Sequence, residues 1–547
     1  MVSELAATIR CCAASGCRSA GGQTLLQALE QAARGCGTGQ APRVKAVGCL
    51  RLCGCGPLVA VDGADGTTRL YGGMTPDQAE ALVQTAATLE QQAGTPLEAQ
   101  AIAADHPFFA LQRPVVLETC GRVDPESIDD AIAHGSYRQL RRVLETFTPE
   151  QVREQVKRSG LRGRGGAGYP TGLKWDTVAL QPPGPRTVVC NADEGDPGAF
   201  MDRSMLESDP HRLIEGMAIA AYAVEAHQGY VYVRAEYPLA IERLQLALKQ
   251  ARARGWLGPK LAGTSFDLRL EVRVGAGAYV CGEETALLAS IQGQRGTPRP
   301  RPPFPAQSGL GGAPTLINNV ETLSAIPVIL REGGDWYGAM GTATSKGTKV
   351  FALSGAVRHT GLVEVPMGTS LRTVVERMGG GTPDGSPVKA VQTGGPSGGC
   401  IPDALLDTPV DYESLLALGS MKGSGGMVVM GETTSMPEVA RHFMRFSRDE
   451  SCGKCIPCRA GTVQLEQLLA RFVERRAVPD DLARLEELCT MVRCTSLCGL
   501  GQAAPNPVLS TLRHFRGEYE AACREPAICE PRTACRLPAA PAAGGAP

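Results

Sequence analysis

The sequence lacks the features that would place it in a membrane or against nucleic acid. A membrane-spanning helix needs about 18 or more consecutive apolar residues, and the most apolar stretch, Leu213 to Val233, contains Glu215, Glu225 and His227. The 55 Lys and Arg residues are matched by 56 Asp and Glu residues, so the net charge is -1. A balanced charge gives no overall field that attracts nucleic acid or an anionic membrane. We therefore expect neither kind of partner.

The sequence also has no recognisable secretion signal at its start and few histidines. The first 20 residues contain no basic head followed by an apolar block, which predicts a cytoplasmic protein. There are only 7 histidines but 20 cysteines, of which seven lie in the first 55 residues and nine from Cys452 onward. Clustered cysteines in a reducing compartment favour iron-sulfur or zinc sites over disulfides. The length of 547 residues predicts about three to four domains.

The N-terminal cysteines form two closely spaced pairs, Cys12 with Cys17 and Cys49 with Cys53. Two pairs of thiolates suit a [2Fe-2S] cluster, in which each iron takes two cysteines. Zinc is the alternative, although zinc sites prefer two-residue gaps. The roles of Cys11, Cys36 and Cys55 stay open. Strands over residues 57–62 and 67–71 and helices over 24–33 and 75–91 predict a small α/β domain around these pairs.

A glycine-rich stretch, Ser159 to Trp175, holds six glycines together with Arg162, Arg164 and Lys174. Backbone amides that few side chains cover can approach a phosphate closely. Its Gly-x-Gly-x-x-Gly pattern formally matches the Rossmann fingerprint, which requires a preceding strand. Here a capping box at Thr148 predicts a helix instead. We therefore interpret the stretch as a phosphate cradle outside an ordinary Rossmann turn.

Acidic and amide side chains follow in three later segments. Asn191, Asp193, Glu194 and Asp196 crowd into one loop after a predicted buried strand, and they suit ribose or ribityl hydroxyls. An acidic surface turn or a divalent-metal loop is the alternative. A second glycine segment begins a helix with two adjacent glutamates, and Asn318 and Asn319 lie at another predicted helix start. Residues 349–431 predict short strands without chemistry, and their 394–399 segment predicts turns only.

The C-terminal cysteines include a C-x2-C-x2-C run of Cys452, Cys455 and Cys458. Such a run with a fourth, distant cysteine is typical of a [4Fe-4S] cluster, and zinc is the alternative. We choose Cys498 as the fourth ligand because glycines flank it, whereas Cys489 and Cys494 lie on a predicted helix. The role of these two stays open, as does that of Cys523, Cys529 and Cys535, which we expect in a disordered tail.

These motifs, in this order, resemble the FMN- and NADH-binding (51 kDa-type) subunit of respiratory complex I. The likeness runs from about Phe108 to Arg516, and the N-terminal block resembles a thioredoxin-like [2Fe-2S] ferredoxin. It implies a multidomain α/β fold. The expected parts are a thioredoxin-like [2Fe-2S] domain (1–92), a non-standard Rossmann-like FMN and NAD(H) domain (105–335), a β-grasp domain (345–432), a helical [4Fe-4S] domain (435–520) and a tail (521–547).

The resemblance also implies site residues. Those expected at FMN are Gly163, Arg164, Gly165, Gly166, Lys174, Asn191, Asp193, Glu194, Gly282, Glu283, Asn318, Asn319 and Thr322. Those expected at NAD are Tyr169, Asp196, Glu284, Arg301 and Phe304. Tyr169, Asp196 and Arg301 differ from the complex I pattern of Phe, Glu and Lys. A carboxylate near the adenine ribose predicts NAD over NADP, because it repels a 2′-phosphate. No acid-base residue is expected, since hydride passes between stacked rings.

The implied activity is that of an NADH:acceptor oxidoreductase (diaphorase) subunit that carries FMN, one [4Fe-4S] and one [2Fe-2S] cluster. The layout is most similar to the beta subunit of soluble NAD-dependent formate dehydrogenases. That likeness implies a hetero-oligomer with a molybdenum- or tungsten-containing, iron-sulfur alpha subunit and a small gamma ferredoxin-like subunit. The alternatives are the diaphorase subunit of an NAD-reducing hydrogenase, a complex I-like NADH dehydrogenase, and an electron-transfer scaffold without flavin activity.

Overall fold

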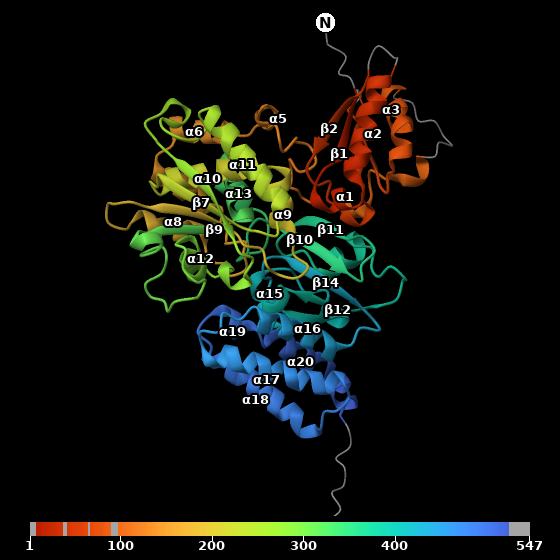
Figure 1. Cartoon of the computed structure of the whole chain (residues 1–547), viewed down its shortest axis with the longest axis vertical. Coiled ribbons are helices and arrows are strands. Elements are labelled where there is room, and N and C mark those ends of the chain that lie inside the picture. The colour runs from red at the N-terminus through yellow and green to blue at the C-terminus, as the bar shows by residue number, and fades with distance from the viewer. Residues whose placement is uncertain (1–6, 37–40, 64–65, 89–96, 524–547) are drawn as a thin grey trace, which may run out of the picture.

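The structure is a computed structural model that describes residues 7–36, 41–63, 66–88 and 97–523. Within these residues the strands form three separate sheets with helices around them, so the expected mixed α/β fold is confirmed. Figure 1 shows the N-terminal sheet, the central sheet and the third sheet grouped together, with the C-terminal helices below the third sheet. Cys529, Cys535 and most of the predicted tail lie outside the described residues.

The N-terminal sheet has the strand order β2-β1-β3-β4-β5, with β1 and β2 parallel and the other pairs antiparallel. Its elements are β1 (Thr8–Cys12), α1 (Ser15–Ser19), α2 (Gly22–Gly35), β2 (Arg43–Val47), β3 (Val59–Asp62), β4 (Thr68–Tyr71), α3 (Ala79–Thr88) and β5 (Ala101–Ile102). The predicted strands over 57–62 and 67–71 are present as β3 and β4. The sequence interpretation included no strand at β1, β2 or β5.

A helical segment leads from this sheet to the glycine-rich stretch. Its helices are α4 (Pro107–Ala110), α5 (Ile128–Ala133), α6 (Arg138–Thr146), α7 (Pro149–Arg158) and, after the glycines, α8 (Thr171–Ala179). The capping box predicted for α7 is confirmed, since the Thr148 hydroxyl accepts the Gln151 N–H and the Gln151 side chain accepts the Thr148 N–H. A helix therefore precedes the glycines, as expected, and the Rossmann context is absent there.

The central sheet is fully parallel, with the order β8-β7-β6-β9. Its strands are β6 (Thr187–Ala192), β7 (Gln228–Arg234), β8 (Arg269–Gly275) and β9 (Thr315–Asn319). Its helices are α9 (Met201–Ser208), α10 (Pro210–Ala223), α11 (Pro238–Ala253), α12 (Glu284–Ile291), α13 (Val320–Glu332) and α14 (Gly334–Gly338). Because the carboxyl ends of parallel strands meet at one edge, the acidic loop after β6 lies beside Asn319 at the end of β9.

The third sheet has the order β11-β10-β14-β12-β13, in which β10 and β14 are parallel. Its elements are β10 (Thr348–Gly355), β11 (Gly361–Pro366), β12 (Val388–Thr393), β13 (Gly399–Pro402), α15 (Tyr412–Ala417) and β14 (Gly426–Gly431). A π-helix, Thr373–Met378, lies between β11 and β12. The loop before β13 contacts Tyr279 and Asn506 through Ser397, and the loop before β14 contacts Asp196 through Ser424.

The C-terminal helices pack around one apolar core that includes Leu465, Leu469, Phe472 and Leu485. They are α16 (Met436–Asp449), α17 (Ile456–Val473), α18 (Pro479–Thr495), α19 (Gly499–Ala503) and α20 (Asn506–Ala521). Among the helices of the described residues, none is long and apolar enough to cross a membrane.

Helix α9 joins the N-terminal sheet to the rest of the chain. The Glu207 carboxylate accepts the backbone N–H of Ser15 at 2.8 Å, and the Ser208 hydroxyl accepts the Cys49 N–H at 2.8 Å. Gly48 packs so closely that a Cβ there would lie 2.3 Å from the Ser208 Cα atom. The contact with α9 thus requires glycine at this position.

We expect Gly48→Ala to lower the apparent Tm measured by calorimetry. Overpacking against a backbone costs about 1–3 kcal/mol, and here it would push the N-terminal sheet away from α9. Gly35→Ala is the matched control, because a Cβ at Gly35 meets nothing within 4 Å. Equal Tm values for the two variants would contradict this account of the interface.

Candidate functional site

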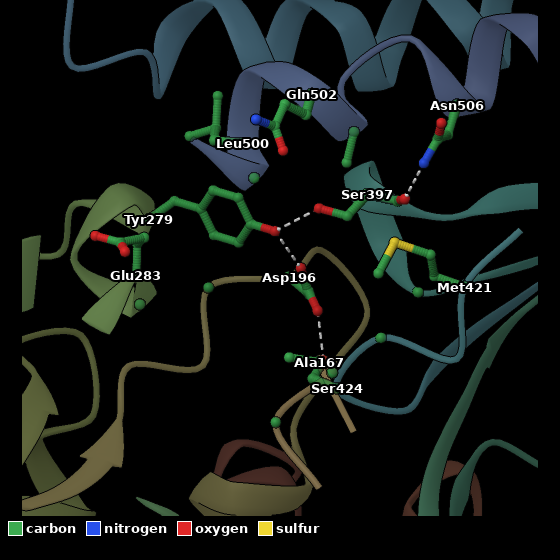
Figure 2. Close-up of a pocket in the computed structure, with 18 of the residues that line it drawn as sticks. Ala167, Asp196, Tyr279, Glu283, Ser397, Met421, Ser424, Leu500, Gln502 and Asn506 are labelled. Atoms are coloured by element: carbon green, nitrogen blue, oxygen red, sulfur yellow. Dashed lines mark hydrogen bonds between the residues drawn. The ribbon is translucent and has the colours of Figure 1, made fainter. Parts of the chain in front are cut away.

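A cavity of about 540 Å³ lies where three parts of the chain meet. Figure 2 shows Asp196 and Tyr279 from the central part facing side chains of the third sheet and of the C-terminal helices. The predicted residues that line it are Gly165, Gly166, Asn191, Asp193, Glu194, Asp196, Gly282, Glu283 and Asn319. Segments far apart in the sequence are therefore brought together as one site.

The glycine-rich loop presents bare backbone to this cavity. A Cβ at Gly165 would lie 3.2 Å from the Cβ of Asn319, and Gly166 has a φ of +122° and packs against Gly423. Gly166 therefore requires glycine for its backbone conformation, and a side chain at Gly165 would have to displace Asn319 slightly. The loop leaves its peptide groups available to a ligand, as its composition predicted.

Four other predicted residues hold the loop from behind. The Arg164 guanidinium is buried and donates to the carbonyl oxygen of Lys346 at 2.6 Å and to the Tyr337 hydroxyl at 3.1 Å. The Thr322 hydroxyl accepts the Arg164 N–H at 2.8 Å. Asn318 accepts the indole N–H of Trp175 at 2.9 Å, and the Gly163 carbonyl accepts from Tyr412 at 2.8 Å. The Arg164 charge is therefore turned away from the cavity.

Three of the carboxylates in the cavity already have several hydrogen-bond donors. Glu194 accepts the backbone N–H groups of Asp202 and Arg203, each at 3.0 Å. Asp196 accepts from the hydroxyls of Tyr279, at 2.8 Å, and Ser424 (Figure 2). These contacts fix the acidic loop against α9, the second glycine segment and the third sheet.

Glu283 also has its donors within the chain, since it caps α12 by accepting the N–H groups of Thr285 and Ala286, each at 3.0 Å. Its neighbour Glu284 points elsewhere. Adjacent residues on a helix point in different directions. Glu283 therefore lines the large cavity, whereas Glu284 lines a second, neighbouring cavity.

Asp193 differs from these three acids. Its Oδ2 atom is buried without a hydrogen-bond partner, and its Oδ1 lies 4.0 Å from the Arg234 Nε. Burial raises the pKa of Asp193 to about 7, although the Arg234 charge opposes the shift. The Asn191 side chain accepts the Asp193 N–H at 3.0 Å and holds the residue in place. Asp193 therefore has an acceptor left for a ligand's donor.

A second cavity of about 330 Å³ lies beside the first, and Ala167 lines both. Tyr169, Lys174, Glu284, Arg301 and Phe304 line it, so four residues expected at NAD lie here together with Lys174, which was expected at FMN. The Lys174 Nζ is 2.5 Å from a Glu284 oxygen. Asp196 is the exception, because it lies in the first cavity.

The aromatic rings of Tyr169 and Phe304 are about half exposed, at 51% and 49%. The guanidinium carbon of Arg301 lies 5.7 Å from the centre of the Phe304 ring. Two exposed rings with cations beside them form a surface on which a flat base can stack and a phosphate can bind.

The four C-terminal cysteines predicted as ligands surround one small space. Cys452, Cys455, Cys458 and Cys498 all line it, although Cys498 is some forty residues from the other three. Val280 and Leu500 line both this space and the large cavity, so a single layer of side chains separates the two. Cys489 is buried in the helical core and Cys494 is exposed, and neither lines the space.

The N-terminal cysteines Cys12, Cys17, Cys49 and Cys53 line another space, and the Sγ atoms of the last two are 3.7 Å apart. Cys17 lies on α1, and Cys53 begins a short 3-10 helix, Cys53–Cys55. The alternation of β1 turns Cys11 to the opposite face, where it packs with α2. Neither Cys11, Cys36 nor Cys55 lines this space.

Helix α9 separates this space from the large cavity. Arg203 and Glu207 line the cysteine space, whereas Asp202 lines the large cavity. In the part of the chain that the structure describes, no three His, Cys, Asp or Glu side chains are placed to hold a single metal ion.

Sequence reasoning missed several lining residues, among them Asp202, Tyr279, Ser397 and Ser424. Tyr279 lies in the second glycine segment, which did indicate a site. Ser397 lies in the 394–399 turn segment, to which only turns were assigned, and the structure shows that this segment closes the cavity (Figure 2). Its contacts with Tyr279 and Asn506 are long-range and leave no local pattern.

This combination defines a class of protein that binds a nucleotide beside cysteine clusters. Residues 156–328 match the Nuo51 FMN-binding domain, residues 438–522 the NADH-ubiquinone oxidoreductase-F iron-sulfur binding region, and residues 350–401 the SLBB domain. The chain belongs to the 51 kDa-type family of FMN- and NADH-binding complex I subunits. It is thus an NAD-dependent flavin and iron-sulfur oxidoreductase subunit.

The relatives include the NADP-reducing hydrogenase subunit HndC of Solidesulfovibrio fructosivorans, which is 55% identical over 75% of this chain and 83% of its own length. An NADH-quinone oxidoreductase subunit of Rhizobium meliloti (strain 1021) is 45% identical over 75% of this chain and 98% of its own. A crystal structure of an NAD+-reducing [NiFe]-hydrogenase in the H2-reduced state matches 95% of this chain and 84% of its own, with 32% identity and a TM-score of 0.67.

We expect Asp193→Asn to gain stability over the flavin-free wild type as pH rises. The folded pKa of about 7 is above the usual value of 3.8. The stabilising effect of the protonated form is therefore complete below the unfolded pKa and is lost as pH rises through the folded pKa. The difference between the two proteins should change by roughly 2 kcal/mol between pH 5 and pH 8. Thermal unfolding at both values measures it, and parallel curves would refute the assignment.

Proposed function

We propose that this chain is a diaphorase subunit that exchanges hydride between NAD(H) and FMN and single electrons with two iron-sulfur clusters. One observation carries the proposal: the large cavity shares Val280 and Leu500 with the C-terminal cysteine space. A flavin accepts electrons in pairs and passes them singly, so it supplies the step between a nicotinamide and a cluster. A bound flavin and a cluster would be separated by only this layer of side chains.

The large cavity fits FMN. Its glycine backbone leaves room for a phosphate, and Asn319 and the start of α13 lie beside that loop. The buried and unpartnered Oδ2 of Asp193 offers an acceptor for an N–H group of the ring. Residues that line the cavity would contact the flavin, and Gly163, Arg164, Asn318 and Thr322 would fix the loop behind it.

The second cavity supports binding of NAD(H). Tyr169 and Phe304 would stack the adenine, Arg301 would face phosphate, and the Glu284 carboxylate would accept ribose hydroxyls while paired with Lys174. A preference for NAD over NADP stays a prediction, and one relative is named as an NADP-reducing enzyme. Activity with both nucleotides at equal concentration would decide it.

The two cysteine sets would hold the clusters, with Cys452, Cys455, Cys458 and Cys498 at [4Fe-4S] and Cys12, Cys17, Cys49 and Cys53 at [2Fe-2S]. We keep the expected domain boundaries of 1–92, 105–335, 345–432 and 435–520, which leave each set of four cysteines within one domain. The strand orders support a thioredoxin-like first domain and a β-grasp third domain.

We infer that the chain works within a hetero-oligomer, since the relatives are named as subunits of larger enzymes. A hydrogenase-type partner has more support than the expected formate-oxidising subunit, because the NAD+-reducing [NiFe]-hydrogenase structure matches the fold over 95% of this chain. None of the relatives described above supports the formate partner. Metal analysis of the purified complex distinguishes the two partners. Nickel or hydrogenase iron would indicate the hydrogenase-type subunit, and molybdenum or tungsten would indicate the formate-oxidising subunit.

The isolated chain, loaded with FMN, should reduce ferricyanide with NADH. Hydride transfer to a stacked flavin needs no partner subunit, because all the residues expected at both nucleotides belong to this chain. Absorbance of ferricyanide measures the rate. A flavin-replete preparation without activity would eliminate the diaphorase function and leave an electron-transfer scaffold.

Cys498→Ser should abolish the [4Fe-4S] signal in electron paramagnetic resonance, because it removes one of four thiolates around the space. Cys494→Ser is the matched control, since its exposed side chain does not line that space. Iron content should fall by about four per chain in the first variant only. Loss of the signal in the control, or its survival in Cys498→Ser, would overturn the ligand set.

A further inference from the structure

The side chain of Lys422 is buried behind the glycine-rich loop without an acidic partner. It belongs to the loop before β14 and is 2% exposed. Its Nζ donates to two backbone carbonyl oxygens, that of Gly423 at 3.1 Å and that of Arg164 at 3.4 Å. Within the described residues it forms no ion pair with a carboxylate. Lysines are almost never fully buried unless they are paired, so this position is unusual.

A second buried cation without an ion pair lies beside it. The Arg164 guanidinium is 1% exposed, and its hydrogen-bond partners in the described structure are hydroxyl and carbonyl groups only. The nearby acid Glu321 is also buried, but it is already paired with Lys349. Buried charges without a counter-ion are costly. Two such cations behind one loop therefore point to an anion that comes from outside the chain.

Lys422 also fixes the direction of a peptide group in the glycine-rich loop. In a planar trans peptide, the C=O group and the following N–H group point in opposite directions. The Arg164 carbonyl is directed toward Lys422, so the Gly165 N–H is directed away from it. Gly165 lines the large cavity, and no acceptor in the described part of the chain takes its N–H. This donor is therefore left for a ligand.

The charged form of Lys422 is costly as long as the cavity holds no anion. Burial, followed by the charges of Lys349 and Arg164, lowers the pKa of Lys422 well below its usual range, and Glu321 opposes the shift. The Nζ lies 4.8 Å from the centre of the Tyr412 ring, whose face attracts a cation. A phosphate in the glycine-rich loop would favour the charged form further, because opposite charges attract strongly where water is excluded.

We propose that Lys422 is a positioning residue for the flavin phosphate. It directs the Gly165 N–H into the cavity and, together with Arg164, supplies positive charge behind the loop. The proposal rests on the function proposed above and adds the origin of a selectivity. The chain should select FMN over riboflavin, which has the same ring and ribityl chain but no phosphate. Lys422 acts through the peptide and through its charge, without touching the ring.

Equilibrium dialysis of the flavin-free full chain against FMN and against riboflavin tests the proposal. The wild type should bind FMN about tenfold or more tightly than riboflavin. Lys422→Met keeps the length of the side chain without its amino group, so it should lose about tenfold or more in FMN affinity and keep its riboflavin affinity. Lys249→Met is the matched control, since Lys249 is exposed on α11, and it should bind both flavins as the wild type does.

A second variant separates the direction of the peptide from the charge. The amide of Lys422→Gln can donate to the two carbonyl groups but has no charge, so its FMN affinity should lie between those of Lys422→Met and the wild type. Circular dichroism shows whether each variant is folded. If Lys422→Met is not folded, Lys422→Gln decides, and an FMN affinity equal to that of the wild type would then overturn the role of the charge.

The remaining outcomes distinguish this proposal from the proposed function. A merely structural role of Lys422 predicts equal losses of FMN and riboflavin affinity in Lys422→Met, and that result would refute the positioning role. An unchanged preference for FMN in this variant would refute it as well. Equal affinities of the wild type for the two flavins would overturn the selectivity without any variant. A wild type that binds neither flavin would refute the proposed function itself.

Discussion

The arrangement of the whole site depends on the Glu194 carboxylate at the amino end of α9. Its two oxygens accept the N–H groups of Asp202 and Arg203, which have no partner inside the helix. A charged hydrogen bond of this kind contributes about 1.5–3 kcal/mol. It fixes α9 beside the acidic loop, and the far end of the same helix holds the N-terminal sheet through Glu207 and Ser208.

Because α9 is fixed in this position, consecutive residues of the helix face different spaces. Asp202 faces the large cavity and Arg203 the N-terminal cysteine space, while Val280 and Leu500 form the wall toward the C-terminal cysteines. Under the proposed function, a flavin would lie between two clusters, each one layer of structure away. The loops of the third sheet complete the cavity, which explains why Ser397 and Ser424 bond to residues of the central part and the glycine-rich loop packs on Gly423.

Much of this arrangement could be predicted from local patterns. The helix before the glycines and the cysteine spacings each depend on a few neighbouring residues, and the fourth cysteine, Cys498, could be chosen from its flanking glycines. The direction of the Arg164 side chain could not, because its partners Tyr337 and Lys346 are distant in the sequence. Asp202 was missed for the same reason, since Asn319, whose amide donates to its carboxylate, is distant in the sequence.

The central claim is that the cavity between α9 and the C-terminal cysteines holds the flavin, with the nicotinamide nucleotide entering beside it. An experimental structure of the chain with FMN and NADH tests this most directly. The account predicts the FMN phosphate against Gly165 and Gly166, the ring beside the Val280 wall, and the adenine between Tyr169 and Phe304. A flavin bound elsewhere, or a nucleotide phosphate of NADH in the glycine-rich loop, would contradict it.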